Sequence, residues 1–142
     1  MADSGAAWVL WDLREPLDGA EEPQHRVESE DHLRFMLDSM RDGPLGIVEL
    51  TRSDRTAGVL RMGIGRGIGG VAWIKTPPRD IRYALATDRI VADDVEFSCW
   101  GQPSMLSAKC ILDADEVIEI AVHFFLYDEV PPWVEWALPN AV

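Results

Sequence analysis

Three strand-like segments follow one another in the middle of the chain with little sequence between them. They are residues 47–51, 59–64 and 71–74, each rich in Val, Ile or Leu. A polar turn at 53–58 separates the first two, and a glycine-rich stretch at 65–70 separates the last two. Consecutive strands with such short connections pair as antiparallel neighbours. The sequence therefore predicts an antiparallel meander as the frame of the fold.

Four other segments have strand-like composition, with different clarity. The apolar run at 7–11 and the segment at 95–100 are each expected to form a strand. Residues 81–85 fit either a strand or a loop edge, and residues 106–112 fit either a strand or an extended lead into the last helix. With these segments the expected sheet has about four to six strands.

A first amphipathic helix is predicted at residues 30–41. Ser29 is a suitable N-cap, and Glu30 and Asp31 place negative charge in the first turn. The helix is expected to stop at residues 42–44, which read Asp-Gly-Pro. Apolar side chains recur at the i, i+3, i+4, i+7 spacing of one helical face, namely Leu33, Met36, Leu37 and Met40.

A second helix is predicted near the end of the chain. Asp113 can act as its N-cap, and Glu116 three residues later completes a capping-box pattern. The proline pair at 131–132 is expected to end this helix, with a short extended segment after it. In such a segment Trp133 and Trp136 would face opposite sides, one in the core and one near the surface. The apolar face of the helix consists of Val117, Ile118, Ala121, Phe124 and Phe125.

Together these elements predict a single α+β domain over residues 1–142. An antiparallel sheet packs two helices on one face and leaves its other face partly solvated. Residues 1–26 are expected at the periphery, as a strand followed by a mobile surface loop from Glu15 to His25. The loop is indicated by its prolines, glycine and acidic residues.

The chain is strongly acidic. It has 142 residues with 25 acidic and 13 basic side chains, which gives a net charge of −12. This charge argues against direct binding to nucleic acid or to an anionic membrane, because attraction to phosphate supplies most non-specific affinity there. It suits a basic protein partner, which an acidic face would steer and orient. An acidic surface kept for solubility alone is the other interpretation.

Negative charge gathers toward the C-terminal end. Residues 113–142 contain neither Lys nor Arg. A well-folded acidic ending without a catalytic set suggests a protein that presents a surface and performs no reaction. The acids of this segment are Asp113, Asp115, Glu116, Glu119, Asp128, Glu129 and Glu135.

Targeting signals and cysteine chemistry are both sparse. The chain has no basic lead followed by an apolar run, and no apolar run approaches the ~20 residues of a membrane span. A cytoplasmic location and no membrane contact are therefore expected.

Cys99 and Cys110 are expected to be free thiols, because no CxxC motif or histidine pair accompanies them. A disulfide or a metal site is the alternative for these cysteines.

No residue pattern points to a catalytic centre. Residues 63–70 contain a formal G-x-G-x-x-G, but β-like residues 71–74 follow where a dinucleotide-binding helix would have to begin. A glycine-rich hairpin turn with a bulge is the favoured interpretation. Glu119 and His123 share a helical face but lack the further ligands that zinc requires. The chain is therefore expected to be non-enzymatic, with no cofactor and no metal.

Several segments together resemble a known family. The helix end at 121–125, the acidic turn after it and the Pro-Trp-Val-Glu-Trp stretch at 132–136 are similar to the closing signature of the first-numbered immunity-protein family of bacterial polymorphic toxin systems. The strand and glycine turn at 60–71 resemble a second part of that family, and the helix at 29–40 fits its order of elements. The resemblance covers residues 27–137.

This resemblance implies a function. Proteins of that family are often paired with nucleic-acid deaminase toxins, so the resemblance implies a non-enzymatic inhibitor that binds and blocks one cognate toxin. Toxins that act on nucleic acid carry basic clefts, which an acidic protein surface can occupy in place of phosphate. The candidate contact residues are acids near strand and helix ends and one neighbouring aromatic anchor, namely Asp93, Asp94, Glu96, Trp100, Asp128 and Glu129.

Two other functions stay open. The chain fits a small-molecule-binding or accessory protein of a biosynthetic cluster, which would have a buried pocket lined by Trp73 and Trp100. It also fits a general regulatory or scaffolding protein that uses the same acidic face. The sequence predicts no oligomeric state.

Overall fold

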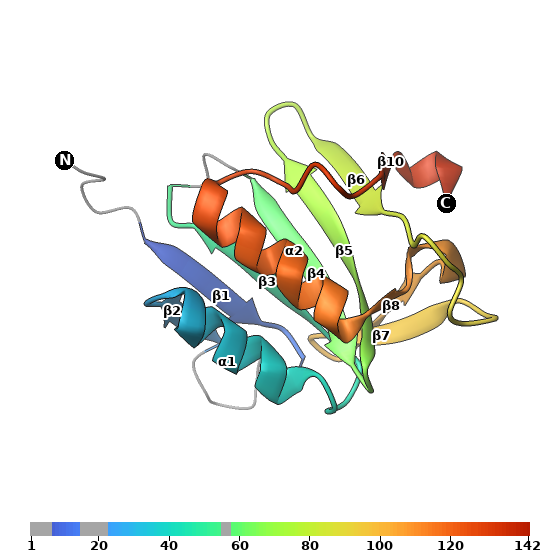
Figure 1. The fold of residues 1–142 in the computed structure, drawn as a ribbon, viewed down its shortest axis with the longest axis horizontal. Helices are drawn as coiled ribbons and strands as arrows, with labels where there is room; N and C mark the ends of the chain where they lie inside the picture. Colours follow the sequence, from blue (N-terminus) through green and yellow to red (C-terminus); the bar gives the residue numbers. More distant parts are fainter. Residues whose placement is uncertain (1–6, 15–22, 55–57) are drawn as a thin grey trace.

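One large β-sheet carries two helices on one of its faces (Figure 1). The computed structural model describes residues 7–14, 23–54 and 58–142. Within these residues ten strands join a single sheet. The predicted α+β class, the antiparallel sheet and the two helices on one face are confirmed. The sheet has more strands than expected because several short edge segments also pair with it.

The strands are β1 (Trp8–Asp12), β2 (Gln24–Val27), β3 (Gly46–Arg52), β4 (Val59–Gly65), β5 (Ile68–Lys75), β6 (Asp80–Ala84), β7 (Val95–Cys99), β8 (Gln102–Leu106), β9 (Leu112–Asp113) and β10 (Trp136–Ala137). Their order across the sheet is β10-β6-β5-β4-β3-β1-β2, with β7 and β8 joined to β3 and β9 joined to β5. Strands β3 to β6 form the predicted antiparallel meander. Among the described strands, only the bridge between Gly46 and Ser98 is parallel.

Strand β1 lies inside the sheet. It pairs with β3 on one side and with β2 on the other, so β2 forms the edge. Strand β1 is therefore second from this edge of the sheet. Of the loop predicted from Glu15 to His25, residues 15–22 lie outside the described part of the chain, and Gln24 and His25 belong to β2. The polar sequence of β2 hid this strand, because an exposed edge needs few apolar side chains.

The β7–β8 hairpin turns at Trp100 and Gly101, which have positive φ angles of 52° and 80°. Cys99 pairs with Gln102, so the turn has two residues and the handedness of a type I′ turn. The strand predicted at 95–100 thus ends one residue early. Strand β8 escaped prediction because tryptophan is an unusual first residue for such a turn and Pro103 interrupts the segment.

Two segments with open assignments belong to the sheet. Residues 81–84 lie in β6, an inner strand between β5 and β10. Residues 106–112 contain the end of β8, a 3₁₀ turn at Ala108–Cys110 and the start of β9. The sequence left both open because each element is too short to show a periodic pattern.

Helix α1 (Glu30–Met40) agrees with its predicted limits. The Ser29 hydroxyl accepts the backbone N–H of His32 at 3.1 Å, as expected of an N-cap. Leu33, Leu37 and Met40 are buried. The predicted apolar stripe is therefore the face that α1 packs against the rest of the protein.

Helix α2 (Ala114–Tyr127) starts as predicted and ends earlier. The Asp113 carboxylate accepts the backbone N–H of Asp115 at 2.9 Å, so Asp113 is the N-cap. The helix ends at Tyr127 because Asp128 adopts a left-handed conformation with φ of 61°. The prediction that the proline pair at 131–132 ends the helix is therefore wrong.

The two C-terminal tryptophans have different environments. The chain turns at residues 132–134, so the extended segment predicted after the prolines is present only as the short strand β10. Trp136 packs beside Trp73, with 6.3 Å between ring centroids, whereas Trp133 is 58% exposed. The prediction that one tryptophan joins the core and the other stays near the surface is confirmed.

The glycine-rich segment forms the hairpin between β4 and β5. Arg66 and Gly67 make the turn, with positive φ angles of 51° and 79°. Pairing continues without interruption from Val59–Ile74 to Gly65–Ile68. The formal dinucleotide motif is therefore a hairpin turn, as predicted, but the predicted bulge is wrong.

The main hydrophobic core lies between the helices and the sheet. Trp8 packs edge-on against Phe124, with 5.3 Å between ring centroids. This face of the sheet is sealed by the helices. The fully buried side chains of this core include Leu10, Val48, Leu50, Leu60, Ile64, Leu33, Leu37, Val117, Ile120 and Phe124.

On the opposite face of the sheet, the described residues cover one end, where the β7–β8 hairpin packs. There Phe97 packs with Leu13, Ile47 and Ile111 in a second, smaller core. Gly63 permits this contact, because a Cβ atom at that position would lie 2.7 Å from the Phe97 ring. We call this helix-free side of β3 to β6 the open face.

Candidate functional site

The outer surface of the two helices is strongly acidic. Helix α2 contains neither Lys nor Arg, and α1 contains a single arginine, Arg34. Arg41, at the end of α1, adds a second cation. We call this surface the acidic helical layer. Its acids are Glu30, Asp31, Asp38, Asp113, Asp115, Glu116, Glu119 and Asp128.

A groove of about 390 Å³ separates α1 from α2 on this layer. Charged side chains line most of it, and Phe35 and Ile118 supply its apolar surface. The phenyl ring of Phe35 is 72% exposed, although it is among the largest apolar side chains of the protein. An exposed aromatic ring among carboxylates is typical of an interface anchor with a charged surround.

Arg34 joins the two helices across the groove. Its guanidinium lies 2.6 Å from Glu119 of α2 and 3.1 Å from Glu30 of its own helix. Hydrogen bonding from Arg34 holds the pKa of the Glu119 carboxyl below its ordinary value. Glu119 is therefore ionised at neutral pH. One cation serves two carboxylates here, so the cluster keeps a net negative charge.

Arg41 makes a second connection of the same kind. It pairs with Asp38 at 2.8 Å and with Asp115 of α2. Asp31, in the first turn of α1, also lines the groove and is exposed. The two arginines thus hold the helices together without neutralising the groove, which remains acidic around Phe35.

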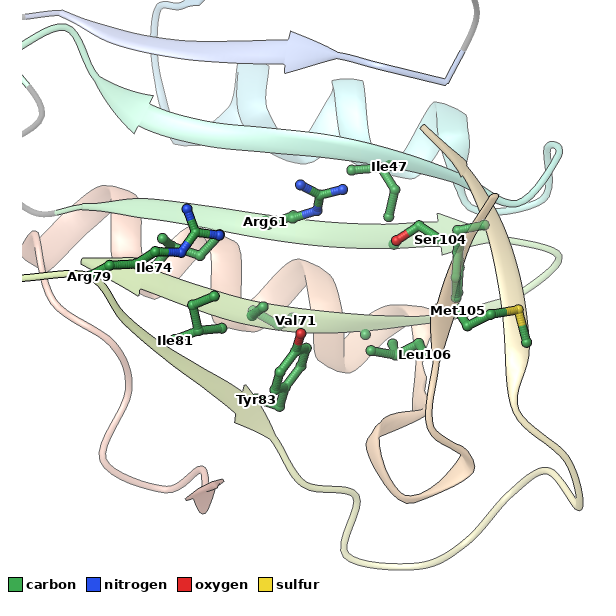
Figure 2. Close-up of a pocket in the computed structure, with 14 residues that line it drawn as sticks. Ile47, Arg61, Val71, Ile74, Arg79, Ile81, Tyr83, Ser104, Met105 and Leu106 are labelled. Carbon is green, nitrogen blue, oxygen red and sulfur yellow. The ribbon is translucent and has the colours of Figure 1, made fainter. Parts of the chain in front are cut away.

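The open face carries a different kind of depression, the central hollow (Figure 2). Its volume is about 220 Å³, and it lies between β4 to β6 and the β7–β8 hairpin. Apolar side chains form most of its walls, including Ile74, Ile81 and Leu106, whereas the side chain of Val71 is buried in the main core on the other face. Its polar side chains in the described part of the chain are Arg61, Arg79, Tyr83 and Ser104, with no carboxylate among them.

Arg61 and Arg79 have different surroundings in this hollow. Arg61 approaches Glu49 at 3.4 Å and donates to the Cys99 sulfur at 3.3 Å. Arg79 is exposed and makes no hydrogen bond or ion pair with any residue in the described ranges. The hollow therefore holds one positioned guanidinium and one that is free to pair with an anion.

A second depression of about 260 Å³, the side hollow, lies on the same face near β1. Trp11 and Trp100 line it, and Arg61 and Cys99 belong to it as well. Trp100 is 38% exposed at the hairpin turn, where its backbone N–H donates to the Leu13 carbonyl at 2.7 Å. Arg61 thus stands between two hollows on the open face.

The structure divides the six predicted contact residues into two groups at opposite ends of the molecule (Figure 1). Asp93, Asp94, Glu96 and Trp100 lie on and beside the β7–β8 hairpin, whereas Asp128 and Glu129 follow α2. All six are exposed. They do not form one continuous patch, although their exposure suits contact with a partner.

Two of the six also have structural partners. Asp94 accepts the backbone N–H of Ala108 at 2.9 Å, which ties the loop before β7 to the 3₁₀ turn. Asp128 pairs with Arg52 at 2.8 Å, which ties the end of α2 to β3. Substitutions at these two positions would change folding as well as any interface.

The pocket expected for a small-molecule-binding protein is not formed. Trp73 packs beside Trp136 near the main core, and Trp100 lines the side hollow on the open face. None of the three depressions described above is lined by both Trp73 and Trp100.

Sequence reasoning missed the residues that stand out in the structure, although weak signals existed. Phe35 falls outside the apolar stripe of its helix, so its exposure was readable from the helical spacing. Arg61 interrupts an apolar strand between Leu60 and Met62, which alternation assigns to the opposite face. Arg79 and Ser104 had no such signal, because only the tertiary fold brings them to one hollow.

Reactive and metal-binding groups are few. Cys99 and Cys110 are free thiols, and burial raises the pKa of the Cys110 thiol. Among the described residues, no cluster of His, Cys, Asp or Glu has the arrangement of a metal site. No helix in these residues has the length and apolar character needed to cross a membrane.

The chain was compared with models of protein families and with curated proteins. Neither the models of protein families nor the curated proteins contain a match to the chain. The resemblance to the immunity family therefore stays a prediction from the sequence, and the surfaces above carry the functional argument.

Proposed function

We propose that this protein is a non-enzymatic inhibitor that binds a basic, nucleic-acid-acting toxin through the acidic helical layer. The observation that carries the proposal is the exposed ring of Phe35 in a groove whose charged surround stays negative. The immunity-family resemblance supplies the class of partner, and a cytoplasmic location fits such a role.

The layer has the features of a surface built for a cationic partner. Its two arginines are already engaged with carboxylates on both helices, so they do not repel an incoming cation strongly. Asp31 and the exposed acids around the groove remain open to partner lysines or arginines. Charge complementarity of this kind raises association rates, and a buried aromatic anchor supplies affinity.

The predicted hairpin and helix-end residues extend this proposal to a second patch. Asp128 and Glu129 continue the acidic helical layer at the end of α2, whereas Asp93, Asp94, Glu96 and Trp100 offer a separate contact at the β7–β8 hairpin. A toxin that reached both would have to wrap around one end of the sheet. The helical groove is the stronger candidate, because it combines negative charge with a concave shape.

The product of the neighbouring gene provides the test. Co-expression of that product with this chain should yield a stable complex and relieve any toxicity of the product in bacteria. The complex should weaken steeply as salt is added, because screening reduces attraction between surface charges. A toxic neighbour that neither binds the chain nor is relieved by it would contradict the proposal. Binding without protection would favour a scaffolding role.

A further inference from the structure

We propose that the central hollow on the open face binds a small organic carboxylate, with the carboxyl group at Arg61 and Arg79 and the apolar body against β5 and β6. This site is independent of the proposed inhibitor function, because it lies on the side of the sheet away from the helices. Figure 2 shows the four polar side chains placed around the hollow from different segments of the chain.

The charge of the hollow is the first reason. The protein carries a net charge of −12, yet the described residues that line this depression include two arginines and no acid. Arg79 has no partner in the described ranges, so its guanidinium is available to a ligand. Arginine forms paired hydrogen bonds with carboxylates, which fixes the direction of the bound group.

Two hydroxyl groups provide the second reason. Tyr83 on β6 and Ser104 on β8 both line the hollow, and neither side chain makes a hydrogen bond within the described part of the chain. Each can donate one hydrogen bond to a carboxylate oxygen. Guanidinium and hydroxyl donors therefore line the same hollow, and a few polar groups among apolar walls are typical of a specific ligand site.

The walls determine what is attached to the carboxyl group. Ile74, Ile81 and Leu106 present apolar surface, and Gly70 leaves the floor without a side chain. A free inorganic anion has no apolar part, so it would leave these apolar walls in contact with water. The volume of about 220 Å³ lies below the range of drug-sized pockets, about 300–1,000 Å³, so the ligand must be small.

The environment of Arg61 favours a singly charged ligand. Its guanidinium is already close to Glu49 and donates to the Cys99 sulfur, so only part of its hydrogen-bonding capacity is free. A dianionic phosphate would need more compensation than one free and one partly engaged arginine supply, because apolar walls replace its hydration. A carboxylate carries a single negative charge, so its burial needs less compensation, and its planar shape matches the planar guanidinium.

Amide chemical shifts of the full chain in NMR spectra, titrated with benzoate and hexanoate, provide the test. Benzamide, which has the shape of benzoate without its charge, is the matched control ligand. We expect saturable shifts on β5, β6 and β8 in the millimolar range or tighter for at least one of the two acids. Benzamide should bind at least about tenfold more weakly.

Three substitutions assign the contacts. R79Q should weaken the binding of the acid about tenfold, since it removes the free guanidinium. R82Q is its matched control, because Arg82 lies on β6 only three residues after Arg79, pairs with Asp80 and does not line the hollow. Y83F removes only a hydroxyl and should weaken binding about threefold.

Four outcomes would overturn the assignment. They are no saturable shift with either acid, equal binding of benzoate and benzamide, an unchanged dissociation constant for R79Q, and equal losses for R79Q and R82Q. R79Q is expected to fold normally, because Arg79 is exposed and makes no hydrogen bond or ion pair with the described residues. None of these results depends on a toxin, so the inhibitor proposal is tested separately.

Discussion

The two faces of the sheet differ in the side chains that the same strands present and in how completely these side chains are covered. Toward the helices, β3 to β5 present large apolar side chains that α1 and α2 cover completely. Away from the helices, the same strands present Gly63, Gly70 and Arg61 beside apolar residues such as Ile47 and Ile74, and among the described residues the β7–β8 hairpin covers only one end of this face. One face supplies stability, and the other leaves room for ligands.

The two sides also differ in charge, and the sign of the charge at the central hollow is opposite to that of the whole protein. The acidic helical layer holds much of the negative charge, whereas the central hollow is lined by Arg61 and Arg79 without an acid. A net charge of −12 therefore describes neither surface. A whole-chain charge predicts the average field around a protein and leaves the chemistry of a local site undetermined.

The largest expected effect contrasts one isoleucine from each side. Ile120 of α2 is fully buried in the main core, and I120A should cost about 2–5 kcal/mol of unfolding free energy. Ile81 lines the central hollow and is partly exposed, so I81A should cost only about 1 kcal/mol. Urea unfolding of both variants measures the difference. Equal losses would show that the open face is packed as tightly as the helical face.

A smaller effect is expected where the hairpin crosses the open face. In G70A the new Cβ atom would lie 2.0 Å from Leu106 Cδ2 and 3.0 Å from the Cys110 carbonyl. We expect a loss of about 1–3 kcal/mol from overpacking. G43A is the control, since its Cβ atom meets nothing closer than 3.5 Å. The pair G70A and L106A should be less destabilising than the sum of the two single changes. Strict additivity would show that Leu106 is not the obstructing side chain.

The smallest effect concerns the connection between the helices. Arg34 lowers the pKa of Glu119 in the folded protein, so this interaction stabilises the fold above the unfolded-state pKa of about 4.5. The stabilisation should disappear as pH falls through the lower, folded-state pKa. E119Q should therefore cost about 0.5 kcal/mol at pH 7, where solvent weakens the pair, and nothing once both states are protonated. E96Q is the control at pH 7, because Glu96 is an exposed acid of β7 without an ion pair among the described residues, and it should cost less than E119Q. A loss for E119Q that persists at low pH would contradict the ion-pair explanation.

Sequence patterns predicted the elements that have many residues of one period. The helical spacing of Leu33, Leu37 and Met40 located α1, and the apolar segments located β3, β4 and β5. Strand β8 was missed, β9 was left open and β10 was expected only as an extended segment, since pairing partners distant in sequence decide whether such segments become strands. Asp128 ended α2 before the prolines because a left-handed cap satisfies the helix end without one.

The candidate sites were less predictable than the fold. Exposure of Asp93, Glu96 and Glu129 follows from their position at element ends, but their separation into two groups required the tertiary arrangement. The central hollow was invisible to sequence reasoning, because Arg79 and Ser104 come from segments far apart in the chain. An isolated arginine or serine has no pattern that distinguishes a ligand contact from a solvated side chain.

The central claim is that the groove between the helices is the partner surface, and affinity for the neighbouring gene product tests it most directly. The variant D31K/F35S changes the groove without removing either arginine connection, and it adds one cation. The comparison variant D93K/E96K adds two cations at the hairpin. The claim predicts that D31K/F35S weakens the complex about a hundredfold or more, while D93K/E96K changes it less than about threefold. A dissociation constant that is unchanged in D31K/F35S and raised in D93K/E96K would contradict the claim and assign binding to the hairpin.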